Sequence, residues 1–168
     1  LKSSGRCQFM CRTMVFGQYD HGLMLAVEQT DKVEGSIFWK VRAKNIVFAT
    51  GAFENPMLFA GNDKPGVMLA NSFCLYIHRY SVAPGRNVFV AISNSADREQ
   101  VLETCQSVGI SIAGVLEAGQ SIKSVKGRTR VTAVKIEESN GKTKTICCDL
   151  ICSSNGWNPA IQLMAQNG

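Results

Sequence analysis

Alternating apolar and polar residues divide the first part of the chain into three short segments. Residues 12–19, 22–30 and 36–42 alternate in this way and are rich in β-branched and aromatic side chains. Such a pattern is typical of half-buried strands. Turn-forming residues at 20–22 and 31–35 separate the segments. The first 42 residues therefore predict a three-stranded antiparallel layer.

The middle of the chain has the pattern of a strand, a helix and a second strand. Residues 87–92 and 110–116 are short apolar runs, which are typical of buried strands. Between them, residues 98–108 carry apolar side chains at helical spacing, and Gly109 follows as a helix-stop residue. This order predicts two parallel strands joined by a right-handed crossover.

Further elements are expected on both sides of this unit. Residues 71–79 predict a helix, with Asn71 and Ser72 as candidate caps. The later elements are strands at residues 121–126, 130–138, 142–147 and 149–153, a hairpin turn at Asn140-Gly141, and a closing helix at residues 160–166.

The stretch from residue 42 to residue 70 organises the rest of the chain. Residues 45–49 form an apolar run that predicts a buried strand, and this run ends in Thr50-Gly51-Ala52. Two prolines and two glycines then exclude a helix up to Gly66. Gly51 has no Cβ, so a ligand or the crossover at residues 53–56 is expected to approach its backbone closely.

These patterns predict two separate sheets. We expect the strand at residues 46–49 to share a sheet with the strand at residues 150–152. The strands at residues 88–92 and 112–116 are expected to form another.

Composition limits the functional classes. The chain has 168 residues, of which 45% are hydrophobic and 18% charged, as in ordinary globular proteins. Its apolar runs are too short to span a bilayer, and no secretory signal is visible. The chain does not begin with Met, which favours a fragment of a longer polypeptide.

Charge and cysteine content add little specific chemistry. The formal net charge is +5, with a modest cluster at Lys123, Lys126, Arg128 and Arg130. This cluster lacks interleaved aromatic residues, so a solvated hairpin face is favoured over a nucleic-acid groove, and contact with another subunit is a further option. The seven cysteines form no C-x-x-C pair, which predicts reduced thiols in a cytoplasmic protein and leaves a metal site as the minor alternative.

Five motifs resemble one enzyme family. They are TMVFGQYDH at residues 13–21, ATGAFENP at 49–56, NDKPGVMLA at 62–70, YSVAPG at 80–85 and SSNGWNP at 153–159. Together they closely resemble the α subunit of heterotetrameric sarcosine oxidase and the related amine, proline and opine dehydrogenase subunits.

The resemblance implies an α/β fold of the two-dinucleotide-binding-domain flavoprotein type, as in glutathione reductase. It contains a parallel β-α-β unit and antiparallel β-meanders. Residues 1–67 would be the last portion of a first FAD/NAD(P)-binding domain, and residues 68–148 an inserted, truncated nucleotide-fold-like domain. Residues 149–168 would return to the first domain.

The chain departs from the nucleotide-binding pattern at the first β-α turn. A dinucleotide loop needs G-x-G-x-x-G so that backbone N–H groups reach the pyrophosphate, but residues 93–97 contain no glycine. Asp97 suits capping, and its charge would repel a phosphate. A structural β-α-β unit is therefore favoured over a second nucleotide site.

A second departure follows Leu116. A helix and a strand, on the order of twenty residues, are absent there by comparison with usual crossovers. Glu117 consequently has two open interpretations, a ribose-contacting acid at a strand end or, as favoured, a loop carboxylate in water.

The resemblance implies cofactor-binding roles for Thr50, Gly51 and Ala52, and for Asn155, Gly156 and Trp157, with Glu117 as the ambiguous addition. A packed aromatic at a corner is an equal alternative for Trp157. The implied cofactor is NAD, with FAD also possible, and no catalytic or metal-binding residue is identified.

The implied function is that of a dinucleotide-binding subunit in a complex that oxidises sarcosine to glycine and formaldehyde. A flavin-bearing β subunit is the expected partner, and this chain alone is expected to be inactive, with weak binding of NAD or FAD. Two alternatives remain open. One is a non-catalytic scaffold whose nucleotide sites have decayed. The other is an FAD/NAD(P)-dependent reductase-like domain, which lacks the expected C-x-x-C here.

Overall fold

The computed structural model describes residues 7–30 and 35–167. The chain divides into two compact units. Unit 1 consists of Leu1–Ala52 and Pro159–Gly168, and unit 2 consists of Phe53–Asn158. The expected domain limits after residues 67 and 148 differ from these divisions, and the domain assignment stays a prediction.

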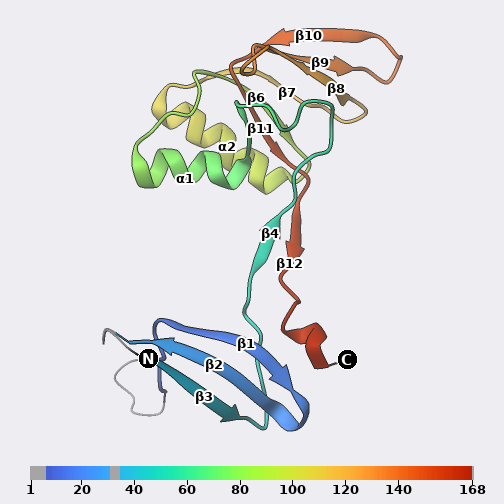
Figure 1. Cartoon of the computed structure of the whole chain (residues 1–168). Helices are drawn as coiled ribbons and strands as arrows, with labels where there is room; N and C mark the ends of the chain where they lie inside the picture. Colours follow the sequence, from blue (N-terminus) through green and yellow to red (C-terminus); the bar gives the residue numbers. More distant parts are fainter. Residues whose placement is uncertain (1–6, 31–34, 168) are drawn as a thin grey trace. The chain divides into compact units, whose positions relative to one another are not determined.

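Unit 1 is built on a three-stranded antiparallel sheet in the order β1-β2-β3 (Figure 1). The strands are β1 (Thr13–Tyr19), β2 (Leu23–Gln29) and β3 (Ser36–Arg42), and the 3-10 turn η1 (Asp20–Gly22) joins the first two. The predicted β-meander is confirmed. Most of the expected turn at residues 31–35 lies outside the described residues.

Two expected elements of unit 1 are wrong. Residues 45–49 do not form a strand, and the side chain of Val47 is 90% exposed. No described strand pairs with this run, and an apolar run becomes a buried strand only where a neighbouring strand satisfies its backbone. The expected helix at residues 160–166 is reduced to the 3-10 turn η2 (Met164–Asn167).

Unit 2 contains a four-stranded parallel sheet in the order β5-β11-β6-β7. These strands are β5 (Val67–Leu69), β6 (Asn87–Ile92), β7 (Ser111–Val115) and β11 (Leu150–Ser154). Helix α2 (Ser95–Val108) joins β6 to β7, which confirms the predicted β-α-β unit. Gly109 ends α2 in the left-handed conformation with φ of 71°, as its position in the sequence indicates.

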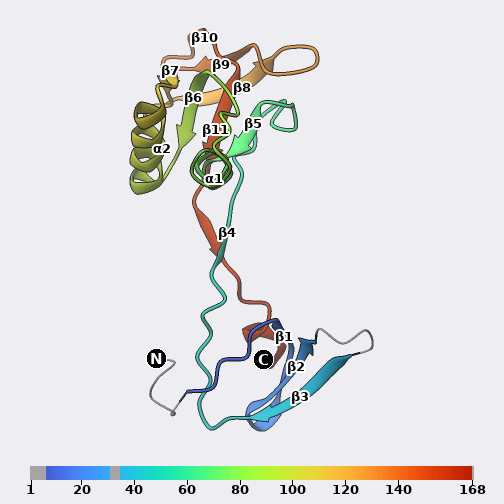
Figure 2. The ribbon, with the colours of Figure 1, turned by 90° about the vertical axis from the view of Figure 1, so that its left-hand side faces the viewer.

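The sheet of unit 2 lies between two layers, as Figure 2 shows. Helices α1 (Ala70–Tyr80) and α2 cover one face, where Phe73 and Val101 pack against β6. The opposite face is covered by an antiparallel meander of β8 (Ser121–Lys126), β9 (Ala133–Glu137) and β10 (Thr143–Cys147).

The expected separation into two sheets is wrong. Cys152 of β11 is paired with Val90 of β6, so β11 lies in the same sheet as β6 and β7. Leu150 and Cys152 pack in the helix-side core, while Ile151 packs in the meander-side core. A strand that is apolar on both faces is best satisfied between two other strands of a covered parallel sheet, and β11 has this place between β5 and β6.

A separate two-stranded ladder joins β4 (Ala52–Glu54) to β12 (Trp157–Pro159). Backbone hydrogen bonds extend it, from Asn55 N to Gly156 O and from Asn155 N to Asn55 O, both at 2.8 Å. In the described part of the chain, no helix combines the length and the apolar character needed to cross a membrane.

Candidate functional site

In unit 2, the carboxyl ends of the parallel strands form the candidate ligand-binding edge of the sheet. In open α/β sheets, ligands bind beyond these ends, where the order of strands reverses direction. Here the chain passes from β6 to β7 on one side, and β11 lies on the other side of β6. The reversal therefore lies between the residues that follow β6, starting at Ser93, and those that follow β11, starting at Asn155.

The N-terminus of α2 is already capped by the protein itself. The side-chain oxygen of Asn94 accepts hydrogen bonds from the N–H groups of Ala96, at 2.8 Å, and Asp97, at 3.3 Å. The carboxylate of Asp97 accepts a hydrogen bond of 2.8 Å from the indole Nε1 of Trp157. The first turn of α2 therefore offers a side-chain cap and an acid where a phosphate would need free N–H groups.

The N-terminus of α1 is capped from a distant part of the sequence. Glu54 accepts hydrogen bonds from the N–H groups of Ala70 and Asn71 through its two carboxylate oxygens, each at 3.0 Å. The expectation that Asn71 and Ser72 cap this helix is wrong, since Leu69 is the cap residue and makes no side-chain cap. A carboxylate is the charge that a helix N-terminus favours, so Glu54 occupies the position of an anionic ligand.

The reversal point itself is bridged by hydrogen bonds. Ser93 donates its N–H to the carbonyl of Ser154 at 3.0 Å and its hydroxyl to Oδ1 of Asn155 at 3.1 Å. These bonds join the loops after β6 and β11 directly. The crevice that holds the ligand in a nucleotide-binding fold is therefore closed at this level by the chain's own polar groups.

A hollow of about 360 Å³ lies beside this edge. It is lined by Met57, Leu58, Phe59, Leu116, Gln120, Ser121, Ile122 and Asn155. Five of the eight lining residues are apolar, and Gln120, Ser121 and Asn155 supply uncharged polar groups. Such a lining suits an apolar group better than a dinucleotide pyrophosphate.

Glu117 lies in the tight connection between β7 and β8. Its N–H donates to Oε1 of Gln120 at 3.1 Å, and its carbonyl accepts from the N–H of Gln120 at 3.1 Å. The residue is exposed. This placement agrees with the interpretation of Glu117 as a loop carboxylate, and its proposed contact with a ribose stays a prediction.

The residues of the A-T-G segment lie in unit 1. The hydroxyl of Thr50 donates to the carbonyl of Ala160 at 2.6 Å, and the N–H of Ala160 donates to the carbonyl of Gly51 at 2.9 Å. Gly51 has a φ of 75°, and no atom lies within 4 Å of the position that a Cβ would take. The expected close approach of the crossover is therefore wrong, and the left-handed conformation is what this glycine provides.

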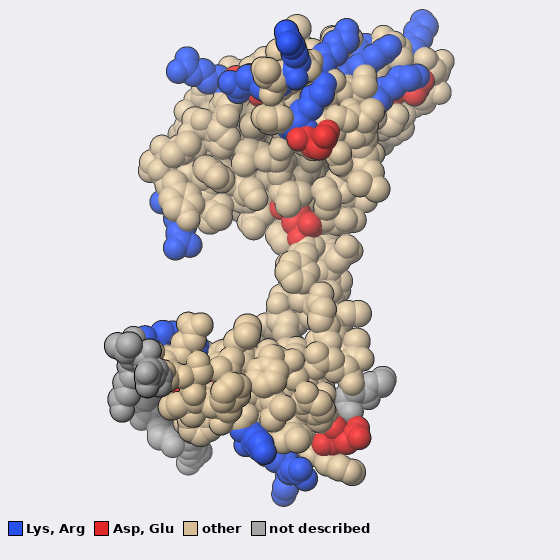
Figure 3. Space-filling view, viewed as in Figure 1, with Lys and Arg blue, Asp and Glu red and all other residues tan. Residues whose placement is uncertain are grey.

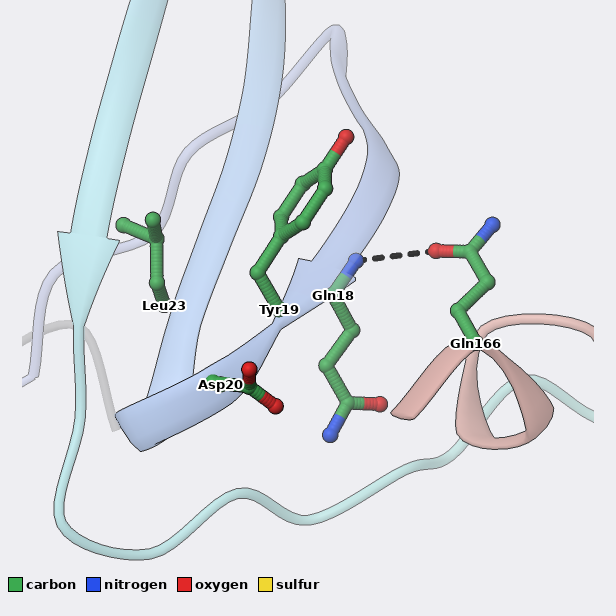
Figure 4. Close-up of a pocket in the computed structure, with 5 residues that line it drawn as sticks. All are labelled: Gln18, Tyr19, Asp20, Leu23 and Gln166. Atoms are coloured by element: carbon green, nitrogen blue, oxygen red, sulfur yellow. Dashed lines mark hydrogen bonds between the residues drawn. The ribbon is translucent and has the colours of Figure 1, made fainter. Parts of the chain in front are cut away.

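A second hollow belongs to unit 1 and is drawn in Figure 4. It has a volume of about 490 Å³ and is lined by Gln18, Tyr19, Asp20, Leu23 and Gln166. The side-chain carbonyl of Gln166 accepts a hydrogen bond of 2.9 Å from the N–H of Gln18. None of the predicted site residues lines this hollow.

The buried cysteines of unit 2, which are Cys74, Cys105, Cys148 and Cys152, contribute packing and no reactive centre. Burial is the main cause that raises the pKa of Cys105 and of Cys148 to about 11, and it raises the pKa of Cys152 further. Buried thiols with raised pKa are poor nucleophiles. Among the described residues, no group of three or more His, Cys, Asp or Glu side chains is arranged to hold a metal ion.

The described residues do not fit a dinucleotide at this edge of the sheet. Both α-helices of unit 2 have capped N-termini, and the reversal point is bridged by Ser93. The sequence shows that the loop at residues 93–97 has no glycine, and the structure adds the cap from Asn94. The contacts of Glu54 and Ser93 were not predicted from the sequence. Each residue binds a partner far away in the sequence, and such contacts have no local sequence motif.

Comparison with known proteins identifies relatives but no family model, since none matches the chain. The chain is 28% identical over 192 residues to sarcosine oxidase subunit alpha of Rhizobium meliloti (strain 1021), a match that covers 100% of this chain and 19% of that protein. It is 29% identical over 191 residues to sarcosine oxidase subunit alpha of Corynebacterium sp. (strain U-96), and this match covers 92% of this chain and 20% of that protein. The resemblance to sarcosine oxidase α subunits is confirmed, and the chain spans about a fifth of the length of these relatives.

The first of these alignments is longer than the chain. It runs over 192 residues, while the chain has 168, so about 24 positions of the alignment have no residue here. In the structure, β7 leads to β8 through residues 116–120 alone.

Two solved structures have a similar fold. L-proline dehydrogenase from P. horikoshii has a TM-score of 0.67 and 29% identity, over 93% of this chain and 29% of that one. An FAD-dependent pyridine nucleotide-disulphide oxidoreductase from Desulfovibrio vulgaris has a TM-score of 0.60 over 94% of this chain and 46% of that one. The identity to the second is 13%, so it shows the fold alone. The predicted α/β fold class, with a parallel β-α-β unit and antiparallel meanders, is confirmed.

Proposed function

We propose that this chain is part of the α-type subunit of an amine-oxidising complex similar to sarcosine oxidase. The observation that carries the proposal is the similarity to sarcosine oxidase subunit alpha over the whole chain. The reaction of the complex would be the oxidation of sarcosine to glycine and formaldehyde, and a flavin-bearing β subunit would be the partner. A cytoplasmic location is part of the same proposal.

Unit 2 serves this complex as a structural module. Its nucleotide-type sheet has helix N-termini capped by Glu54 and Asn94, and its reversal point is bridged by Ser93. These contacts support a rigid scaffold better than a site that exchanges a soluble nucleotide. The flavin chemistry would then be held outside unit 2, and this chain would bind NAD or FAD weakly.

L-Proline is the second candidate substrate of the complex. The similarity to L-proline dehydrogenase, at 29% identity and a TM-score of 0.67, favours it. Sarcosine and proline are both secondary α-amino acids, so both have an amine nitrogen bonded to a second carbon besides Cα. The oxidation of a C–N bond at this amine is therefore the same type of reaction for both candidates.

The test uses the full-length protein, co-expressed and purified with candidate partner subunits from the same organism. Sarcosine and L-proline are supplied with an artificial electron acceptor, and formaldehyde is measured separately. Formaldehyde from sarcosine supports the first candidate, and acceptor reduction with L-proline alone supports the second. A purified assembly that oxidises neither compound, or a protein that associates with no other subunit, contradicts the proposal.

A further inference from the structure

The meander of unit 2 is rich in basic residues. Residues 121–147 contain seven Lys or Arg and two Glu residues, a net charge of +5, which equals the formal net charge of all 168 residues. The basic residues are Lys123, Lys126, Arg128, Arg130, Lys135, Lys142 and Lys144. Figure 3 shows Lys and Arg side chains, in blue, gathered on this part of unit 2.

The turn between β8 and β9 holds two of these arginines in a fixed backbone. Gly127 has a φ of 124°, and a Cβ there would overlap the carbonyl of Arg130. The turn is closed by a hydrogen bond of 3.0 Å from Thr132 N to Lys126 O. Arg128 and Arg130 are both exposed on it. A fixed turn reduces the conformational entropy that is lost when its side chains bind a partner.

Lys64 adds a third cation at the base of this turn. Its ammonium group donates hydrogen bonds to the carbonyls of Val125, at 3.1 Å, and Gly127, at 2.9 Å. The segment that contains Lys64 is also attached to the turn through a bond of 2.9 Å from Val131 N to Pro65 O. The N-D-K-P-G motif therefore fixes the basic turn onto the body of unit 2.

An apolar hollow of about 400 Å³ opens beside the same turn. It is lined by Pro65, Gly66, Val67, Met68, Pro84, Arg130 and Leu150. Arg130 is its one charged residue. The strand β5, which supplies Val67 and Met68, is the edge strand of the parallel sheet. A hollow of this kind accepts an apolar side chain whose neighbours carry negative charge.

We propose that this turn and hollow bind an acidic segment of a partner protein. An apolar side chain of that segment occupies the hollow, and its flanking carboxylates pair with Arg128, Arg130 and Lys126. Arginine suits this role because its guanidinium takes a carboxylate through two parallel hydrogen bonds. The identification of that partner as another subunit of the oxidase rests on the proposed function.

The chemistry of the meander favours a protein over other anionic partners. Residues 121–147 contain no aromatic residue on which a base would stack. Within the described residues of this meander, no large apolar side chain is exposed for insertion into a membrane. Glu137, which is paired with Lys123 at 3.0 Å, lies on the same sheet, and its negative charge would repel the phosphates of a nucleic-acid backbone.

The test measures binding of a synthetic heptapeptide in which one phenylalanine is flanked by acidic residues on both sides. The full-length protein is titrated with this labelled peptide by fluorescence anisotropy, at low and at high ionic strength. The variant Arg128→Glu/Arg130→Glu is compared with Lys40→Glu/Lys44→Glu, which makes the same charge change on exposed residues of unit 1. A third variant, Arg128→Lys/Arg130→Lys, keeps the charge but removes the guanidinium groups.

The proposal predicts that the Arg→Glu variant binds at least about tenfold more weakly, because attraction becomes repulsion, while the unit 1 control changes by less than about twofold. The Arg→Lys variant is expected to lie between them. A peptide with alanine in place of phenylalanine is expected to bind more weakly to the wild type. Equal binding by the Arg→Glu variant and the control, in samples with unchanged circular dichroism, would overturn the proposal.

Two further arms separate the alternatives. Duplex DNA and phosphatidylserine vesicles are titrated in the same buffer, and binding of either one without binding of the peptide overturns the proposal. Co-purification of the Arg→Glu variant with the partner subunits is measured as well. If the wild type co-purifies with no subunit, the proposed function fails, while the peptide titration still decides whether the acidic-segment site exists.

Discussion

The two units of the molecule contain similar hydrophobic patterns but bury them differently. In unit 2, residues 88–92 of β6 are all buried, with apolar neighbours on both faces of the sheet. In unit 1, Gly17 and Ala26 are the only buried residues among the described positions of β1, β2 and β3. A pattern of apolar residues therefore predicts a strand, but burial depends on the layers that the rest of the fold supplies.

The sheet of unit 1 has apolar side chains on both faces. Its register places Met14 and Phe38 on one face and Ile37 and Val41 on the other. Met14 is 63% exposed and Phe38 is 73% exposed. Core substitutions in unit 2 should therefore cost far more stability than equivalent substitutions in unit 1.

The largest effect is expected for Phe89→Ala in unit 2. Phe89 is fully buried in the meander-side core, so its loss should lower the free energy of unfolding by about 3–5 kcal/mol. The matched change Phe38→Ala in unit 1 should cost less than about 0.5 kcal/mol, because the ring is mostly exposed. Chemical denaturation of both variants measures the difference, and equal losses would contradict the contrast between the units.

A smaller effect is expected for Glu54→Ala. This change leaves the N–H groups of Ala70 and Asn71 without their carboxylate cap, which should cost about 1–2 kcal/mol. Glu103→Ala is the control, because Glu103 is an exposed residue in the interior of α2. Thermal unfolding followed by circular dichroism compares them. A Glu54 variant as stable as the control would show that the cap contributes little.

The loss of stability caused by Gly51→Val should be smaller than that caused by Glu54→Ala. Valine has room at this position but must adopt a φ of 75°, which costs on the order of 1 kcal/mol for a β-branched residue. Gly51→Asn should be nearly neutral, since asparagine tolerates the left-handed region. Equal unfolding temperatures for the valine and asparagine variants would contradict this account of the glycine.

The next prediction concerns the reactivity of the thiols at neutral pH, which needs no substitution. In the structure, Cys7, Cys11 and Cys147 are exposed, while Cys74, Cys105, Cys148 and Cys152 are buried. The exposed three should react quickly with a thiol reagent in the native protein, and all seven should react after unfolding without reductant. Fewer than seven reactive thiols in the unfolded protein would reveal a disulfide and contradict the expectation of reduced cysteines.

The same thiols set a pH dependence at high pH. Burial raises the pKa of Cys105 and Cys148 from 9.0 to about 11, so between these values the unfolded state loses protons that the folded state retains. Stability should therefore be unaffected by these groups below pH 9 and should fall as the pH rises from about 9 to about 11. Cys105→Ala should reduce this slope. An unchanged slope in that variant would contradict the assignment.

The comparison of sequence with structure shows which signals are local. The bounds of β6 and β8 match the predicted ranges, and those of β7, β9, β10 and β11 fall within a few residues, because apolar runs and turn residues act locally. The short strands β4, β5 and β12 were not predicted. The place of β11 between β5 and β6 was missed, since strand order depends on contacts between distant segments. The strand predicted at residues 45–49 is wrong for the same reason, because no described strand pairs with this run.

In the candidate site, too, local features were predicted from the sequence and contacts between distant residues were not. The lack of glycine in the loop at residues 93–97 argues against a phosphate-binding loop, and Asn94 adds a cap there. The cap from Glu54 to α1 joins residues that are 16 positions apart, and the bond from Ser93 to Asn155 joins residues 62 positions apart. Such contacts follow from the fold and have no local pattern in the sequence.

The central claim is that unit 2 keeps a nucleotide-type sheet without a working dinucleotide site. Calorimetric titration of the 168-residue chain with NAD and with FAD tests this most directly. With its helix N-termini capped by Glu54 and Asn94, the chain should bind either compound no more tightly than about millimolar, which corresponds to about 4 kcal/mol. Saturable micromolar binding of either dinucleotide would contradict the claim.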